Sequence, residues 1–264
     1  MKDLHVTLVQ SDIYWEDSSK NLESFERVLG DLKEKTDLIV LPEMFNTGFS
    51  MNLQSCAEKM DGETIAFLRE TAGKLDSMIM GSILIAEEGS YFNRLIAVSP
   101  DGLLHQYDKR HLFRLSEEYK IMSGGKNKTL LTWKGWKLLP LICYDLRFPV
   151  WSKNRWINRE YEYDLLVYAA NWPKSRAGIW KSLLVARAIE NQCYVIGVNR
   201  IGKDGQGTSH AGDSMVVGPG GEILVSAPEE KPAILTTLLS MEKLQDFRTN
   251  YPFAPDWDQF IIHP

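Results

Sequence analysis

Cysteine, metal-ligand clusters and long apolar runs are scarce or missing in this sequence of 264 residues. The three cysteines, at positions 56, 143 and 193, are odd in number and widely spaced, which argues against a disulfide scaffold and indicates a reducing compartment. The five histidines never pair at ligand spacing, so no metal site is expected. No apolar run approaches the length of a membrane span, and the amino-terminal stretch lacks the apolar core of a signal peptide.

A surplus of basic residues is missing as well. The 30 lysines and arginines are outnumbered by 35 aspartates and glutamates, which gives a net charge of -5 and no excess positive charge to neutralise phosphates. The content of 44% hydrophobic and 25% charged residues is typical of a globular protein with a sizeable core. We therefore expect a cytoplasmic protein that binds neither nucleic acid nor membrane and needs no cofactor.

Helix-like and strand-like segments are mixed along the whole chain, with no linker rich in proline, glycine or serine and no internal repeat. Strands are predicted at 4–10, 37–43, 77–86, 164–173 and 193–200, helices at 17–35, 63–75, 177–192 and about 240–248, and hairpins around 100–102, 134–135 and 220–221. This order favours a single α/β domain over residues 1–264, with two sheets face to face and helices outside. The tail, about 250–264, is rich in aromatic residues, so we expect it to dock on the body or on a partner subunit.

Three short stretches place reactive side chains at the ends of predicted strands. Glu43 lies in VLPEMFNTGF, Lys109 in YDKRHLF and Cys143 in LICYDLRFP. Each has a bland interpretation: a solvated glutamate, a surface charge cluster and a small buried hydrophobe. A cysteine on a tight turn after a strand, however, is presented to substrate beside backbone N–H groups that stabilise an oxyanion. Such a thiol needs a base and a positive neighbour, and Glu43 and Lys109 could fill these roles.

The ordered motifs LPE, YDKRH and CYDLRFP resemble the nitrilase superfamily of carbon–nitrogen hydrolases. The resemblance extends over almost the whole chain, through NWP (171–173), RAIENQCYVIGVNR (187–200) and GDSMVVGPGGEIL (212–224). It implies a four-layer α-β-β-α sandwich, a homodimer and a Glu–Lys–Cys triad. The Phe113-Arg114 flank, NWP and ARAIENQ are most similar to the bacterial omega-amidase branch, which acts on ω-amides of 2-oxo dicarboxylic acids.

The resemblance also implies a mechanism. Glu43 would take the thiol proton of Cys143, the thiolate would attack the amide carbon, and Lys109 with the backbone N–H of Tyr144 would hold the oxyanion. The superfamily has a second glutamate upstream of the cysteine. Glu118 fits its spacing better than the adjacent Glu117, and we expect it to orient the lysine.

A carboxylate on the substrate calls for a guanidinium group. Arg176 follows NWP directly and is our first candidate; Arg147 is the alternative, unless it braces the cysteine turn through an internal ion pair. Phe113 and Trp172 are expected as apolar walls, although packing residues would look the same. His210 is interpreted as a loop residue.

Two other functional hypotheses remain at this point. The first is a different amidase, a carbamoylase or a nitrilase of the same superfamily, because the triad is shared and only the pocket discriminates. The second is a non-catalytic binding protein of the same fold, which the presence of all four catalytic candidates disfavours. A small-molecule amide and water are the expected partners in the favoured hypothesis.

Overall fold

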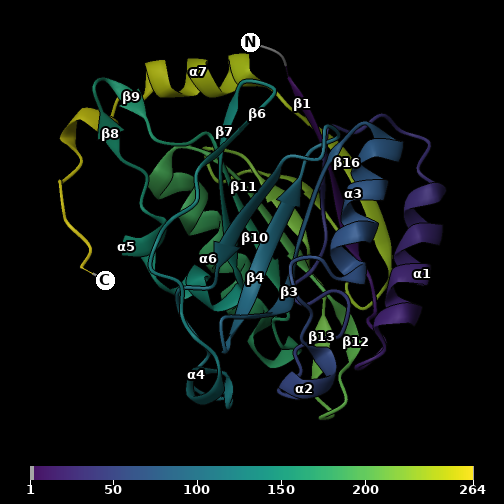
Figure 1. The fold of residues 1–264 in the computed structure, drawn as a ribbon. Coiled ribbons are helices and arrows are strands. Elements are labelled where there is room, and N and C mark those ends of the chain that lie inside the picture. Colours follow the sequence, from purple (N-terminus) through teal and green to yellow (C-terminus); the bar gives the residue numbers. More distant parts are fainter. Residues whose placement is uncertain (1–2, 264) are drawn as a thin grey trace.

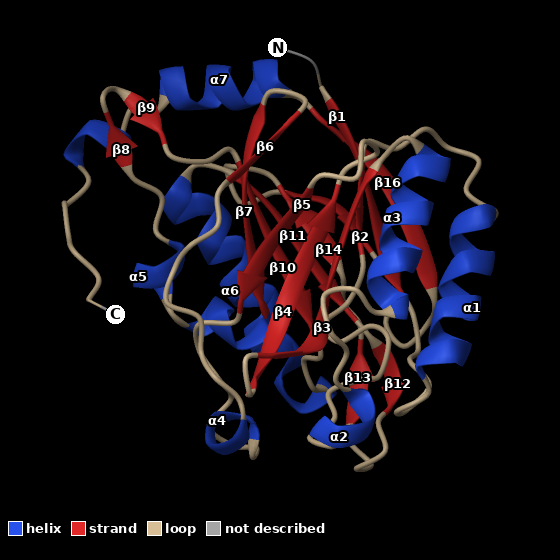
Figure 2. Cartoon of the chain, in the orientation of Figure 1, coloured by secondary structure: helices blue, strands red, loops and turns tan. Residues whose placement is uncertain are grey.

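Two six-stranded sheets stack face to face in the computed structural model, which describes residues 3–263 (Figures 1 and 2). The first sheet contains, in spatial order, β16 (Ala233–Leu239), β1 (Leu4–Gln10), β2 (Leu38–Val40), β3 (Met78–Glu87), β4 (Ser90–Val98) and β5 (Leu104–Asp108). The second contains β15 (Ile223–Ser226), β14 (Met215–Val217), β11 (Tyr194–Asn199), β10 (Leu165–Ala170), β7 (Trp136–Ile142) and β6 (Leu131–Trp133).

The main helices lie on the outer faces of the two sheets. α1 (Ser18–Gly30) and α3 (Glu63–Leu75) cover the first sheet, and α6 (Ala177–Asn191) covers the second (Figure 2). The remaining elements are α2 (Leu53–Cys56), α4 (Glu118–Ile121), α5 (Pro149–Ser152), α7 (Met241–Asn250), the 3-10 helices η1 (Cys143–Arg147), η2 (Lys174–Arg176) and η3 (Ala254–Asp256), and the small pairs β8 (Trp156–Ile157) with β9 (Glu160–Tyr161) and β12 (Ile201–Lys203) with β13 (Ser209–Ala211). The predicted four-layer α-β-β-α sandwich is therefore confirmed.

The alternating direction of the side chains along each strand explains the two layers of apolar core. In β1, Val6 and Leu8 belong to the large cluster between the sheets, whereas Val9 belongs to a second cluster beneath α1 and α3. Successive side chains of a strand point to opposite faces, so a strand buried on both sides is apolar throughout. The helices supply the outer half of the second cluster through residues such as Phe25 and Leu68.

Strand direction brings the ends of several strands to one edge. β1, β2 and β3 are parallel, and two antiparallel steps from β3 through β4 make β5 run the same way as β2. In the other sheet β7, β10 and β11 are parallel. The carboxyl ends of β2 and β5 therefore share one edge, as do those of β7, β10 and β11.

Some predicted boundaries were wrong. The first helix was expected over 17–35 but ends at Gly30, because beyond Leu29 the chain is mostly charged and offers little for the core. The strand expected over 164–173 ends at Ala170, since the next residue turns its backbone N–H away to a carboxylate of the first sheet. The short hairpin of β12 and β13 was not predicted at all.

The chain after α7 packs against β9 and against the residues that follow α5. The ring of Trp257 packs edge-on against Tyr161, and the Lys153 ammonium lies 3.5 Å from the centre of that indole ring. Arg110 donates a hydrogen bond to the carbonyl oxygen of His263 at 3.2 Å. Other aromatic side chains of this segment, such as Phe253, are exposed. Among residues 3–263, no helix has the length and apolarity that crossing a membrane requires.

Candidate active site

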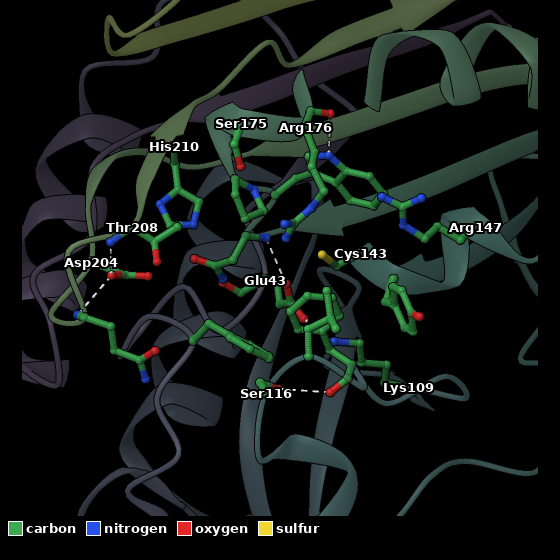
Figure 3. A pocket seen from close by; sticks show the side chains of 18 residues that line it. Glu43, Lys109, Ser116, Cys143, Arg147, Ser175, Arg176, Asp204, Thr208 and His210 are labelled. Carbon is green, nitrogen blue, oxygen red and sulfur yellow. Dashed lines mark hydrogen bonds and ion pairs between the residues drawn. The ribbon is translucent and has the colours of Figure 1, made fainter. Parts of the chain in front are cut away.

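Three strand ends meet around a cavity of about 380 Å³, drawn in Figure 3. Glu43 follows β2, Lys109 follows β5 and Cys143 follows β7, so the two sheets contribute from opposite sides. All three side chains line the cavity. Its size lies in the range of about 300–1,000 Å³ that is usual for small-molecule sites.

Cys143 sits on a sharp turn. β7 ends at Ile142 and the 3-10 helix η1 begins at the cysteine itself, whose φ is +40°. This left-handed conformation is costly for a side chain with a Cβ atom, so the surrounding structure has to hold it in place. The turn presents the sulfur to the cavity while nine-tenths of the residue remains buried.

Asp145 holds this turn. Its carboxylate accepts hydrogen bonds from the backbone N–H of Ile142 at 3.1 Å and from the hydroxyl of Tyr107 at 2.7 Å. The other oxygen accepts from the backbone N–H and the Nδ1 of His111, at 3.0 and 2.8 Å. The aspartate thereby ties the cysteine turn to the end of β5, next to Lys109.

A buried ion cluster surrounds Lys109. Its ammonium donates to Glu43 Oε1 at 2.8 Å and to both oxygens of Glu118 at 3.0 and 3.1 Å. The three side chains are at most 1% exposed. The ring of Phe49 lies 5.0 Å from the ammonium on another side. Two carboxylates around one ammonium leave a net negative charge, which favours the protonated lysine.

Two asparagines orient the carboxylates. Asn93, from β4, donates to Glu43 at 2.8 Å and to Glu118 at 3.2 Å, and its own oxygen accepts from Ser82. From the other sheet, the backbone N–H of Asn171 donates to Glu43 Oε2 at 2.8 Å. The base candidate is therefore held by donors from both sheets, and its orientation is set before any substrate arrives.

Burial controls the protonation of this cluster. Burial, and next the charge of Glu43, raises the pKa of the Cys143 thiol well above its ordinary value, although Lys109 acts in the opposite direction. Burial alone would favour the neutral amine of Lys109, but Glu118 and Glu43 outweigh it and raise its pKa. The resting site thus holds a neutral thiol beside a charged ammonium, and a nearby base has to remove the thiol proton.

Comparisons with known proteins agree with this geometry. The family model described as Carbon-nitrogen hydrolase matches residues 5–249. The chain belongs to the carbon–nitrogen hydrolase family. It is 42% identical to the protein named Omega-amidase YafV from Escherichia coli K12 over 99% of this chain and 100% of the relative, and 30% identical to 2-oxoglutaramate amidase of Bacillus subtilis over 95% and 96%.

Solved structures of this superfamily share the fold. XC1258 from Xanthomonas campestris, a CN-hydrolase superfamily protein with an arsenic adduct in its active site, superposes with a TM-score of 0.97 at 41% identity, over 100% of both chains. Saccharomyces cerevisiae Nit3, a member of branch 10 of the nitrilase superfamily, gives a TM-score of 0.84 at 27% identity over 96% of both chains. This chain is accordingly a carbon–nitrogen hydrolase in fold and reaction class, as the sequence resemblance indicated.

The two adjacent glutamates of this carbon–nitrogen hydrolase lie in different environments. Glu118 is fully buried against Lys109, and it also accepts a hydrogen bond from the backbone N–H of Phe113 at 2.5 Å. Glu117 is exposed and pairs with Lys120 at the surface. Only Glu118 can act on the buried lysine.

The remaining predicted residues also lie at the cavity. Phe113, Tyr144 and Trp172 line it, together with Arg147 and Arg176. The guanidinium of Arg147 lies 4.9 Å from the centre of the Trp172 ring, and that of Arg176 lies 5.5 Å from the centre of the Phe113 ring. Neither arginine forms an ion pair with a carboxylate within residues 3–263, so the internal ion pair considered for Arg147 is absent there and Asp145 braces the turn instead.

Some residues at the site were missed from the sequence or misinterpreted. Asn93 lies mid-strand, and nothing in its surroundings marks it as a partner of two carboxylates. Asn171 stood inside the recognised NWP motif, which was the available signal. The interpretation of His210 as a loop residue was wrong: it lies in β13, is 3% exposed and lines the cavity.

Proposed function

We propose that this protein is an omega-amidase that hydrolyses the terminal amide of 2-oxo dicarboxylic acid monoamides, such as 2-oxoglutaramate and 2-oxosuccinamate, to the acid and ammonia. One observation carries the proposal. A buried cysteine lies beside a Glu43–Lys109 pair at the base of a cavity whose wall carries two guanidinium groups. The relatives named omega-amidase and 2-oxoglutaramate amidase, aligned over nearly the whole chain, support the same reaction.

The first half of the reaction forms a thioester. Glu43 accepts the thiol proton of Cys143, and the sulfur attacks the carbon of the substrate amide. Lys109 and the backbone N–H of Tyr144, at the start of η1, stabilise the oxyanion that develops on the amide oxygen. The protonated Glu43 then gives its proton to the departing nitrogen, so ammonia leaves and the acyl group stays on sulfur.

The second half hydrolyses the thioester. Glu43 takes a proton from water, whose oxygen attacks the acyl carbon, and the same oxyanion site is used again. Collapse releases the carboxylic acid, and the thiolate recovers its proton from Glu43. Glu118 contributes by holding the ammonium of Lys109 in position through two hydrogen bonds.

The two arginines of the cavity support a diacid monoamide as the substrate. A carboxylate at the end of the substrate away from the amide needs a guanidinium partner, and an arginine without an internal carboxylate partner is available for one. Arg176 is the first choice because its helix η2 follows the Asn171 turn directly. Arg147, stacked on Trp172, is the second.

Ammonia release from a panel of substrates tests the proposal. The panel contains 2-oxoglutaramate, simple aliphatic amides, N-carbamoyl amino acids and nitriles, and we expect 2-oxoglutaramate to have the highest kcat/KM. The C143A variant should release no ammonia and unfold as the wild type does, whereas C193A, which removes a buried cysteine outside the cavity, should stay active. Nitrile turnover without amide turnover would refute the assignment.

We further propose a cytoplasmic homodimer. Val150, Ile179 and Ile189 are exposed on α5 and α6, on the outside of the second sheet, where a second copy would cover them. The thiol chemistry suits a reducing compartment. Sedimentation equilibrium should give twice the mass of the chain, and fractionation of cells should place the protein in the cytoplasm.

A further inference from the structure

His210 occupies an unusual position for a side chain that the mechanism does not use. It is 3% exposed, lines the cavity, and its Nδ1 has no hydrogen-bond partner among the described residues. Buried polar atoms are nearly always paired, so a bare ring nitrogen at a substrate cavity indicates a group that pairs with substrate. Figure 3 shows the ring directed toward the cavity, on the side away from Arg147.

The backbone places His210 next to the arginine proposed for the carboxylate. Pro173 forms an isolated antiparallel bridge with His210. The same Pro173 accepts a hydrogen bond from the backbone N–H of Arg176 at 3.0 Å. His210 and Arg176 thus flank one residue, and in Figure 3 they lie along the same wall of the cavity.

The surroundings of His210 keep its ring neutral. Burial, and next the charge of Arg200, lowers its pKa to about 4, although Asp204 and the backbone of Gly202 oppose this. A neutral imidazole has one N–H donor and one acceptor nitrogen. Asp204 also lines the cavity, and one of its oxygens accepts from the backbone N–H groups of Gln206 and Thr208. The carboxylate of Asp204 disfavours an anionic group directly at His210, so an uncharged oxygen suits His210 and the substrate carboxylate is left to Arg176.

These observations lead to one assignment, which rests on the proposed omega-amidase function. We infer that His210 donates a hydrogen bond to the 2-oxo oxygen of the substrate while Arg176 binds the neighbouring carboxylate. The oxo oxygen and the carboxylate oxygens of the substrate belong to adjacent carbons, and His210 and Arg176 both contact Pro173 through their backbones. His210 is therefore a specificity-determining residue that distinguishes a 2-oxo acid amide from the same chain without the oxo group.

A comparison of two substrates measures the proposed hydrogen bond from His210 to the oxo group. 2-Oxoglutaramate and glutaramate have the same carbon chain, amide and carboxylate, and differ only in the oxo group. We expect the ratio of their kcat/KM values to fall about tenfold in H210L, as a lost hydrogen bond predicts, and to recover in part in H210Q, which keeps an N–H donor. R176M should lower both values together and leave the ratio near that of the wild type. H105Q, which changes a histidine outside the cavity, should behave as the wild type does.

Inhibition by the product acids provides a second readout that does not require turnover. The wild type should bind 2-oxoglutarate more tightly than glutarate, and H210L should lose that difference. An unchanged substrate ratio in H210L and H210Q, or equal inhibition of the wild type by the two acids, would overturn the role of His210 while leaving the omega-amidase assignment intact. A wild type that released ammonia from neither substrate would instead overturn the proposed function, and this inference with it.

Discussion

Asp145 is the residue whose replacement should best reveal how the nucleophile is held. The carboxylate is fully buried, and its two oxygens accept four hydrogen bonds that join the turn of Cys143 to the end of β5. In D145N an NH₂ group replaces one oxygen and faces two donors. The ring of His111 can turn to accept, but a backbone N–H cannot, and the oxygen of Tyr107 already accepts two hydrogen bonds.

The cost of D145N follows from those contacts. In either orientation of the new amide, the backbone N–H of Ile142 or that of His111 loses its acceptor, and the remaining bonds lose their charge assistance. A hydrogen bond to a charged group contributes about 1.5–3 kcal/mol, and an unpaired buried donor costs a similar amount, so we expect a loss of about 3 kcal/mol in the free energy of unfolding. Relaxation of the strained turn at Cys143 should also displace the sulfur, which lowers kcat by about a hundredfold for a shift near 1 Å.

Urea unfolding and ammonia release measure the two effects separately. The matched control is D101N, the same change in an exposed turn where the carboxylate accepts from Ser99 and from the backbone N–H of Leu103. Its stability should stay within about 0.5 kcal/mol of the wild type. If D145N lost less than about 1 kcal/mol and kept its kcat, Asp145 would not be the brace of the turn.

Two further perturbations test the site from other directions. The pKa of His210 is lowered from 6.5 to about 4 in the folded protein, so the unfolded chain binds the extra proton first and stability falls as the pH drops from 6.5 toward 4. This linkage amounts to about 3 kcal/mol in the free energy of unfolding. The urea midpoint should therefore change less with pH across that window in H210N than in the wild type, and an equal slope would contradict the argument. A Cβ atom at Gly125 would lie 2.1 Å from the backbone oxygen of Asp108, next to Lys109. G125A should therefore lose about 1–3 kcal/mol in the free energy of unfolding, with a lower melting temperature and a lower kcat. G178A, with nothing within 4 Å of the new Cβ, is its control, and equal melting temperatures would refute the predicted clash.

The architecture was predictable because its causes are local. Apolar strands such as 4–10 and amphipathic helices such as 63–75 carry their own periodicity, and both elements have the predicted bounds in the structure. The β12–β13 hairpin was missed because its strands are three residues each and the connection is rich in glycine, so no alternation could be read. Short strands are stabilised by what they pack against, and the sequence does not display that.

The site, like the fold, has one part that the sequence predicts and another part that it does not. Glu43, Lys109 and Cys143 each follow a strand, and parallel strand ends share an edge, so their proximity was an expectation that motifs could support. The contacts that orient them come from elsewhere: Asn93 from the middle of β4, and Asn171 from the opposite sheet. No spacing in the sequence encodes a hydrogen bond between side chains 50 residues apart, such as that of Asn93 with Glu43.

The cavity therefore combines two sets of residues with different origins. The set proposed to carry out the reaction, Glu43, Lys109 and Cys143, follows strands of the two large sheets, whose positions the core fixes, and it can serve any amide. The set proposed to select the substrate, Arg176 and His210, lies on η2 and on the small hairpin, both outside the two large sheets. Changes in these short elements can alter the substrate without disturbing the buried ion cluster. A specificity residue should accordingly be sought where the structure is least regular, which is where sequence periodicity says least.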